Sequence, residues 1–121
     1  MTMSTKVVNA KDVTPEMWAS GLYVYGGRGG WSYKQKIRYK DSGWGNPYRI
    51  GPDGTREEVV AKHRADFLED SQDARARRKR LIATFGGKFI VCHCSPLACH
   101  CDVYAEICNS QEAEARNATA H

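Results

Sequence analysis

The chain lacks the features that place a protein in or across a membrane. Among its 121 residues there is no run of about 18 apolar side chains, so we expect no membrane span and no membrane partner. The opening stretch, MTMSTKVVNAKD, has no apolar segment of the kind found in secretory signals. We therefore expect a single small domain that works in a reducing cytoplasm.

The sequence also has little excess of one charge, with a net charge of +4. This value is below what a dedicated DNA-binding protein often shows, but the basic residues are concentrated in two segments. Residues 75–80 read RARRKR, and basic residues alternate with aromatic ones over 28–40. Such a pattern suits a polyanion that presents flat bases, although a solvated helix face and a loop would look the same. The candidate nucleic-acid contacts are Lys34, Lys36, Arg38, Arg77 and Arg78.

Zinc knuckles of the C-x2-C type are missing, and so is an even number of cysteines. Four of the five cysteines and two of the four histidines lie instead in one stretch, CHCSPLACHCDVY, at residues 92–104. The odd count and the reducing compartment argue against disulfides. Three interpretations remain open: a zinc site, a reactive thiol or ligand site, and cysteines that are merely buried. The candidate metal ligands are Cys92, Cys94, Cys99 and His100.

Helices alternate with strands along the chain, which predicts an α/β fold. We expect a buried strand at 21–25 and a central strand at 88–94. The segment 31–47 is expected to be a long loop with a short strand at KIRYK. Helices are expected at 14–18, from a capping box at Thr55 to about 68, at 73–85 and at 102–108. The fold class is thus a small single α/β domain at 1–109, with a mostly parallel sheet flanked by helices, and a flexible tail at 110–121.

Both unusual segments follow a predicted strand, and ligands of parallel sheets gather beyond the carboxyl ends of the strands. Glycines 26, 27, 29 and 30 follow the first strand, and the cysteine cluster follows the second. No helix starts directly after these glycines, so they form no dinucleotide-binding fingerprint. We expect one shared pocket, with Cys92 buried in the sheet beside it. The residues expected to converge there are Arg28, Asn46, Cys99, His100 and Asp102.

The combination of YGGR, SGWGNPY and GGKFIVCHCSPLACHCDVY resembles the phage-associated family catalogued as domain of unknown function 4326. The likeness spans roughly residues 21–109. It departs at Gly29, where the family has proline, and at Cys101, where it has glycine. The resemblance implies that Cys101 is not an essential ligand, and that the chain has a phage or prophage origin and acts inside a bacterial cell. The positions that match the family are Arg28, Asn46, Pro47, Lys88, Cys92, Cys94, Pro96, Cys99, His100 and Asp102.

Two functions follow as hypotheses. In the first, the protein is an enzyme that acts on a nucleotide or a nucleic-acid base. Its ligand-binding residues would be Arg28, Asn46 and Lys88, with His100 or Asp102 as general acid or base and Cys99 as nucleophile. In the second, it is a non-enzymatic module that binds nucleic acid or a host protein and holds a structural zinc ion.

Overall fold

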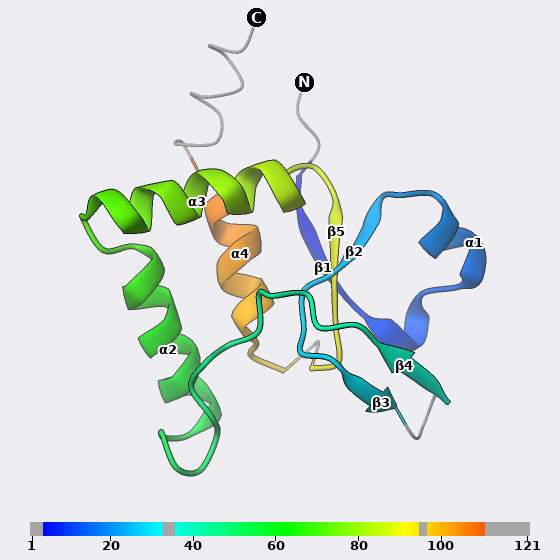
Figure 1. Ribbon diagram of the computed structural model, residues 1–121, viewed down its shortest axis with the longest axis horizontal. Helices are drawn as coiled ribbons and strands as arrows, with labels where there is room; N and C mark the ends of the chain where they lie inside the picture. Colours follow the sequence, from blue (N-terminus) through cyan, green and yellow to red (C-terminus); the bar gives the residue numbers. More distant parts are fainter. Residues whose placement is uncertain (1–3, 33–35, 95–96, 111–121) are drawn as a thin grey trace, which may run out of the picture.

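The computed structural model describes residues 4–32, 36–94 and 97–110 (Figure 1). Most of the predicted tail, from residue 111 on, lies outside these ranges. No helix in the described ranges has the length and apolar character that crossing a membrane requires. The elements, in chain order, are β1 (Lys6–Asn9), the 3-10 helix η1 (Ala10–Asp12), α1 (Pro15–Ala19), β2 (Tyr23–Tyr25), β3 (Gly30–Ser32), β4 (Ile37–Tyr39), α2 (Arg56–Phe67), α3 (Gln72–Phe85), β5 (Phe89–Cys92) and α4 (His100–Cys108).

The main sheet is parallel and has the strand order β1-β5-β2. Central strand β5 pairs Ile90 with Val7 on one side and with Val24 on the other. A separate antiparallel pair joins β3 to β4. Figure 1 shows α2, α3 and α4 together on one side of the sheet, with α1 and the β3–β4 hairpin on the other. The predicted α/β class with a mostly parallel sheet is therefore confirmed.

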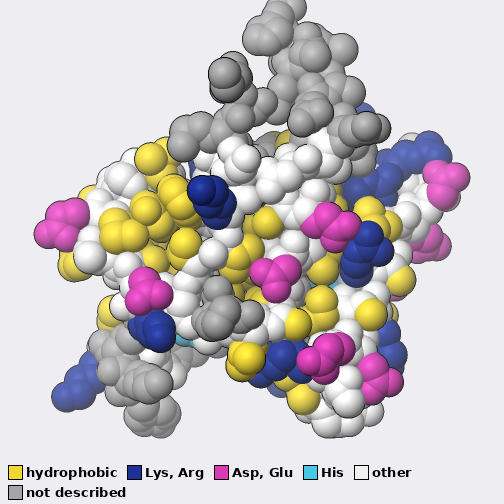
Figure 2. Space-filling view, turned by 180° about the vertical axis from the view of Figure 1, so that it is seen from behind, with side chains coloured by type: hydrophobic (Ala, Val, Ile, Leu, Met, Phe, Trp, Pro, Cys, Tyr) yellow, Lys and Arg dark blue, Asp and Glu magenta, His cyan; other side chains and the backbone are white. Residues whose placement is uncertain are grey.

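The core lies between the sheet and the three longer helices. Ile90 and Val91 of β5 are fully buried, as expected for a central strand covered on both faces. Helix α4 buries the face predicted from its apolar spacing, and Tyr104 is its largest buried side chain. The face seen in Figure 2 carries basic and acidic side chains interspersed with apolar ones, in keeping with the small net charge.

Local signals set most helix boundaries correctly. Thr55 accepts a hydrogen bond from the backbone N–H of Glu58, whose carboxylate accepts one from the Thr55 N–H, which completes the predicted capping box of α2. Thr14 caps α1 in front of Pro15, and Gly86 follows α3, also as predicted. Helix α4 begins at His100, two residues before the predicted start, because Cys99 serves as its N-cap residue.

One strand prediction needs correction, and two of the strands were not predicted. Strand β2 is at the sheet edge and only half-buried, whereas a buried strand was expected. Strand β1, which pairs with the other side of β5, was not predicted, because only two adjacent valines, at 7 and 8, mark it. In the expected loop 31–47, the short strand predicted at KIRYK is present as β4, and it pairs with β3, which was not predicted, as a short hairpin.

Candidate functional site: a cavity beside a cysteine cluster

A cavity of about 500 Å³ opens where β2 and β5 end. This volume is within the range of ligand-binding pockets, about 300–1,000 Å³. The segment after β4 and the beginning of α2 form the opposite wall. The residues around it are Tyr25, Gly27, Arg28, Asn46, Tyr48, Arg49, Ile50, Pro52, Arg56, Val59, Val60, Cys92, His93, Cys94, Ala98, Cys99 and His100. Four of the five residues expected to converge, all but Asp102, thus line one cavity.

The charged side chains that line the cavity are all basic among the described residues: Arg28, Arg49 and Arg56, beside His93 and His100. The guanidinium of Arg28 donates to the carbonyls of Asn46 and Tyr48, so it holds the opposite wall. Arg56 donates to the Ala98 carbonyl at 3.2 Å. A wall of arginines without a carboxylate favours an anionic ligand.

The side chain of Asn46 holds the wall rather than offering its amide to a ligand. Asn46 is 7% exposed; its Nδ2 donates to the carbonyl of Val59 on α2, and its Oδ1 accepts from the Tyr48 N–H. Tyr48 in turn donates from its hydroxyl to the carboxylate of Asp66 at 2.6 Å. Asn46 was expected to bind the ligand; it lines the cavity, and the hydrogen bonds at both ends of its amide give it a positioning role in the wall.

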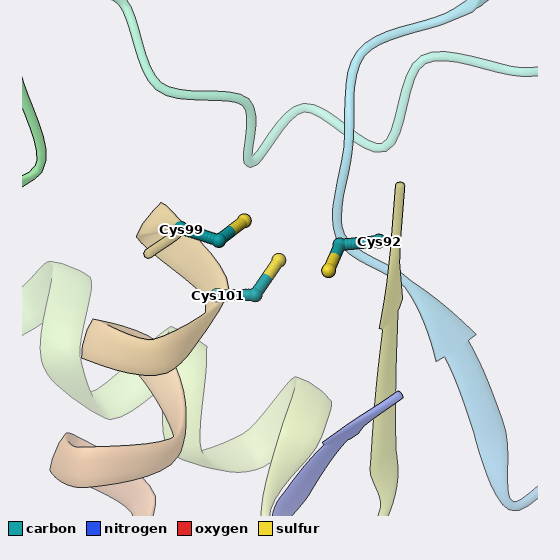
Figure 3. Close-up of side chains that lie close together, drawn as sticks. All are labelled: Cys92, Cys99 and Cys101. Atoms are coloured by element: carbon teal, nitrogen blue, oxygen red, sulfur yellow. The ribbon is translucent and has the colours of Figure 1, made fainter. Parts of the chain in front are cut away.

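The cysteine cluster lies beside the cavity. The sulfur atoms of Cys92, Cys99 and Cys101 lie within 4.8 Å of one another, and all three residues are buried. Figure 3 shows the side chains from the start of α4 and the end of β5 pointing toward each other. All five cysteines are free thiols. Three buried cysteines are thus close enough to hold a metal ion, and Cys92 is buried in the sheet as predicted.

The cluster does not make Cys99 a reactive thiolate. Hydrogen bonds with the thiols of Cys101, Cys92 and Cys94, together with burial, raise the pKa of Cys99 above its usual range. The pKa of Cys94 is lowered instead, first by its hydrogen bond from Cys99 and then by Arg56. The expected benefit of a helix N-terminus for the Cys99 thiolate is thus outweighed by its thiol neighbours and by burial.

His100 connects the cysteine cluster to the glycine segment after β2. Its Nε2 lies 2.8 Å from the carbonyl oxygen of Gly26, which can only accept, so Nε2 carries the proton. In the neutral ring Nδ1 is then an acceptor, and it lies 3.6 Å from the sulfur of Cys99. The metal set expected from the sequence included His100, but Cys101 completes the close group. The reason is geometric, since the N-cap residue Cys99 and Cys101 in the first turn both point inward.

Asp102 acts on the helix, not on the cavity. Its carboxylate accepts a hydrogen bond from the backbone N–H of Cys99 at 3.0 Å, which caps α4 and fixes the conformation of that cysteine. Asp102 is not among the described residues that line the cavity. It is therefore a positioning residue for α4, and the expectation that it converges on the shared pocket is wrong.

Lys88 lies at the wrong end of the sheet for the proposed ligand. It precedes β5, and its backbone N–H donates to the carbonyl of Phe85 at the end of α3. The cavity opens beyond Cys92, at the opposite end of the same strand. The expectation that Lys88 binds the same ligand as Arg28 is therefore wrong on geometry.

The two basic segments differ in what their side chains contact. Arg78 is 9% exposed and donates to the carbonyls of Phe67 and Glu69, where α2 ends. The guanidinium of Arg77 lies 4.3 Å from the centre of the Phe67 ring. Both arginines thus stabilise the α2–α3 connection, which argues against the predicted nucleic-acid contact.

On the other basic segment, Lys36 and Arg38 are exposed on the β3–β4 hairpin. Lys34 lies outside the described residues. Arg28, Trp31 and Tyr39 line a smaller hollow of about 260 Å³ beside the hairpin.

Sequence reasoning missed Arg49 and Arg56 in the cavity wall. Arg49 precedes the turn formed by GPDG, and Arg56 is the first residue of α2. Neither is part of a recognisable motif, and each reaches the cavity only because the turn and the helix fold back toward β5. The sequence signal that could have found them was that Arg49 and Arg56 flank a clearly predicted turn and helix start.

The fold and cavity define a small α/β protein with a cavity at the carboxyl edge of a parallel sheet. A family model with the description Domain of unknown function (DUF4326) matches residues 8–110, and the chain belongs to this family. No curated protein and no solved structure gave a match.

Proposed function

We propose that the protein is an enzyme that binds a nucleotide, or a nucleic-acid base with its phosphate, in the cavity beside the cysteine cluster. The observation that supports this most is the lining of the cavity: three arginines and, among the described lining residues, no carboxylate. We further propose that it is a phage or prophage protein that works in the cytoplasm of the bacterial host cell, as the family resemblance implies.

The cavity offers separate surfaces for the two parts of a nucleotide. The basic wall suits phosphate, because guanidinium groups bind phosphate oxygens with charge-assisted hydrogen bonds. Ile50, Pro52, Val59 and Val60 provide an apolar wall for a flat base. Tyr25 lies between the walls; burial raises its pKa to about 12, so its hydroxyl stays protonated and donates to the Arg28 carbonyl.

The candidate catalytic residues are His100 and Cys99, which line the cavity. His100 is the candidate general acid or base, since its ring is fixed by the Gly26 carbonyl and its Nδ1 is an acceptor. Cys99 is the weaker candidate, because a thiol with a raised pKa is a poor nucleophile at neutral pH.

Calorimetric titration with nucleoside mono-, di- and triphosphates tests the binding step. Arg49 is exposed at the cavity mouth, and Arg49→Ala is expected to weaken nucleotide binding about tenfold, the size of one lost charge-assisted hydrogen bond. Arg75→Ala is the matched control, because Arg75 pairs with Asp70 on the surface away from the lining. Equal affinities for the two variants, or no nucleotide bound by the wild type, would contradict the proposal.

Turnover separates the enzyme from the second candidate, a non-enzymatic module for nucleic acid or a host protein with a structural zinc ion. The exposed Lys36 and Arg38 beside Trp31 favour this alternative. Mass spectrometry of the reaction mixture measures turnover. A nucleotide product that forms with the wild type but not with His100→Ala supports the enzyme. Binding of single-stranded nucleic acid that is lost on Arg38→Glu, without turnover of any nucleotide, supports the module.

A further inference from the structure

Four of the five cysteines meet where β5 ends and α4 begins. Cys92 is the last residue of β5, and Cys94 follows two positions later. Cys99 is the N-cap residue of α4, and Cys101 lies in its first turn. The sulfurs of Cys92, Cys99 and Cys101 lie within 4.8 Å of one another. The thiol of Cys94 is hydrogen-bonded to that of Cys99. Cys94 lies outside this close group of three and is connected to it through its hydrogen bond with Cys99.

We propose that Cys92, Cys94, Cys99 and Cys101 together bind one zinc ion. Thiolates are soft ligands that select zinc over magnesium or calcium. A tetrahedral zinc ion lies about 2.3 Å from each sulfur, which separates the sulfurs by about 3.8 Å. The three closest sulfurs are within 4.8 Å of one another, so movements of about 1 Å or less bring them to that spacing.

The surroundings of the cluster suit such an ion. Zinc with four thiolates carries a net charge of −2, and the positive end of α4 and Arg56, hydrogen-bonded to Cys94, lie beside it. The Asp102 carboxylate adds charge of the opposite sign, but its hydrogen bond to the Cys99 backbone orients that ligand.

The inferred ion ties the strand to the helix and forms the floor of the cavity. Cys92, Cys94 and Cys99 line the cavity. Cys101 is not among the described lining residues and is fully buried. A methyl group added at Gly26 would lie 3.0 Å from the Cys101 sulfur, so the glycine segment after β2 packs directly on the cluster. With four protein ligands the site has no open position, which makes it structural.

The ligand set differs from the one the family resemblance implied, since Cys101 stands where that pattern has glycine. If Cys101 is a ligand, its removal leaves a three-thiolate site that holds zinc more weakly. The chain provides a matched control in Cys108, which is also buried, also on α4, and outside the close group of sulfurs.

The full chain, purified under reducing conditions, is examined by native mass spectrometry and by replacement of the metal with cobalt. We expect one zinc ion per chain and a cobalt spectrum with strong sulfur-to-metal charge transfer. Cys101→Ser is expected to weaken zinc binding at least tenfold, while Cys108→Ser binds zinc like the wild type.

A reduced wild type that binds neither zinc nor cobalt overturns the inference, and so does equal zinc affinity in Cys101→Ser and Cys108→Ser. Should Cys101→Ser fail to fold, the cobalt spectrum of the wild type decides: an intensity for four thiolates supports the set, and an intensity for three or fewer contradicts it. None of these readouts involves a nucleotide, so the result is separate from the outcome for the proposed function.

Discussion

The two ends of strand β5 are built in different ways. At the amino end the polar groups pair with one another: Thr5 donates from its backbone to Asn109 and accepts from the Asn109 side chain, at 2.8 and 2.9 Å. The Thr5 hydroxyl also bridges the Phe85 carbonyl and the Gly87 N–H. At the carboxyl end, arginines and thiols surround an open cavity.

The difference indicates that the groups that stabilise the sheet and the groups proposed to bind ligands lie at opposite ends of the same strand. The amino end joins β1, α3 and α4 through hydrogen bonds that need no ligand. The carboxyl end gathers like charges and several thiols, an arrangement that stabilises little by itself and becomes favourable when an anion or a metal ion is bound. Substitutions at the amino end should therefore lower the free energy of unfolding alone, whereas changes at the carboxyl end should also affect the binding of a metal ion or an anion.

Metal removal should give the largest effect, and only at the carboxyl end. If zinc occupies the four-cysteine site, chelation is expected to lower the free energy of unfolding by more than about 5 kcal/mol, since structural zinc sites supply about 10–16 kcal/mol of apparent binding energy. Thermal unfolding with and without a chelator measures this. Cys108→Ser should respond like the wild type, and a chelator-insensitive wild type would contradict the comparison.

Acidification should produce the next largest effect, through His63. The ring is 1% exposed, and its Nε2 lies 2.7 Å from the hydroxyl of Tyr104. That hydroxyl donates its single proton to the Trp44 carbonyl at 2.6 Å, so His63 must donate from Nε2. Its buried Nδ1 has no hydrogen-bond partner among the described residues, and burial, helped by His100 and Arg77, lowers the His63 pKa to about 4.

Because the folded pKa lies below the unfolded value of 6.5, the unfolded state binds the proton first. Stability from this group is complete above pH 6.5 and is lost as the pH falls toward 4, by a total on the order of 3 kcal/mol. Urea unfolding at several pH values measures the slope. His63→Gln keeps an N–H donor without a titrating ring, and it should flatten the curve over this window; an unchanged slope would exclude His63 as the cause.

Much of the fold could be predicted because its signals are local. The capping box at Thr55 and the apolar face of α4 identified their helices from neighbouring residues alone. Strand β1 could not be predicted, since KVVN has two apolar residues and becomes a strand only by pairing with β5, about eighty residues later. Non-local pairing of this kind leaves almost no mark in a short segment.

The candidate site shows the same division. The strand-end rule brought Arg28, Cys99 and His100 to one cavity, as expected. The rule did not predict Lys88, which was expected to bind the ligand and matches the family resemblance; that residue precedes the strand and lies at its other end. The strand-end rule also says nothing about the direction of a helix side chain such as Arg78. That side chain turns inward to the end of α2, because two carbonyls there lack helical partners.

The smallest effect is expected at the amino end, from Asn109→Ala. The change removes both hydrogen bonds to the Thr5 backbone and leaves a partly buried N–H and carbonyl unpaired, which costs about 1–2 kcal/mol. Asn109→Asp keeps the acceptor for the Thr5 N–H but loses the donor to its carbonyl, and should lie between the alanine variant and the wild type. Urea unfolding measures these losses, while zinc content and nucleotide affinity should stay at wild-type values. An Asn109→Ala variant that lost ligand along with stability would show that the two ends of β5 are coupled, and the separation argued from their hydrogen bonds would fail.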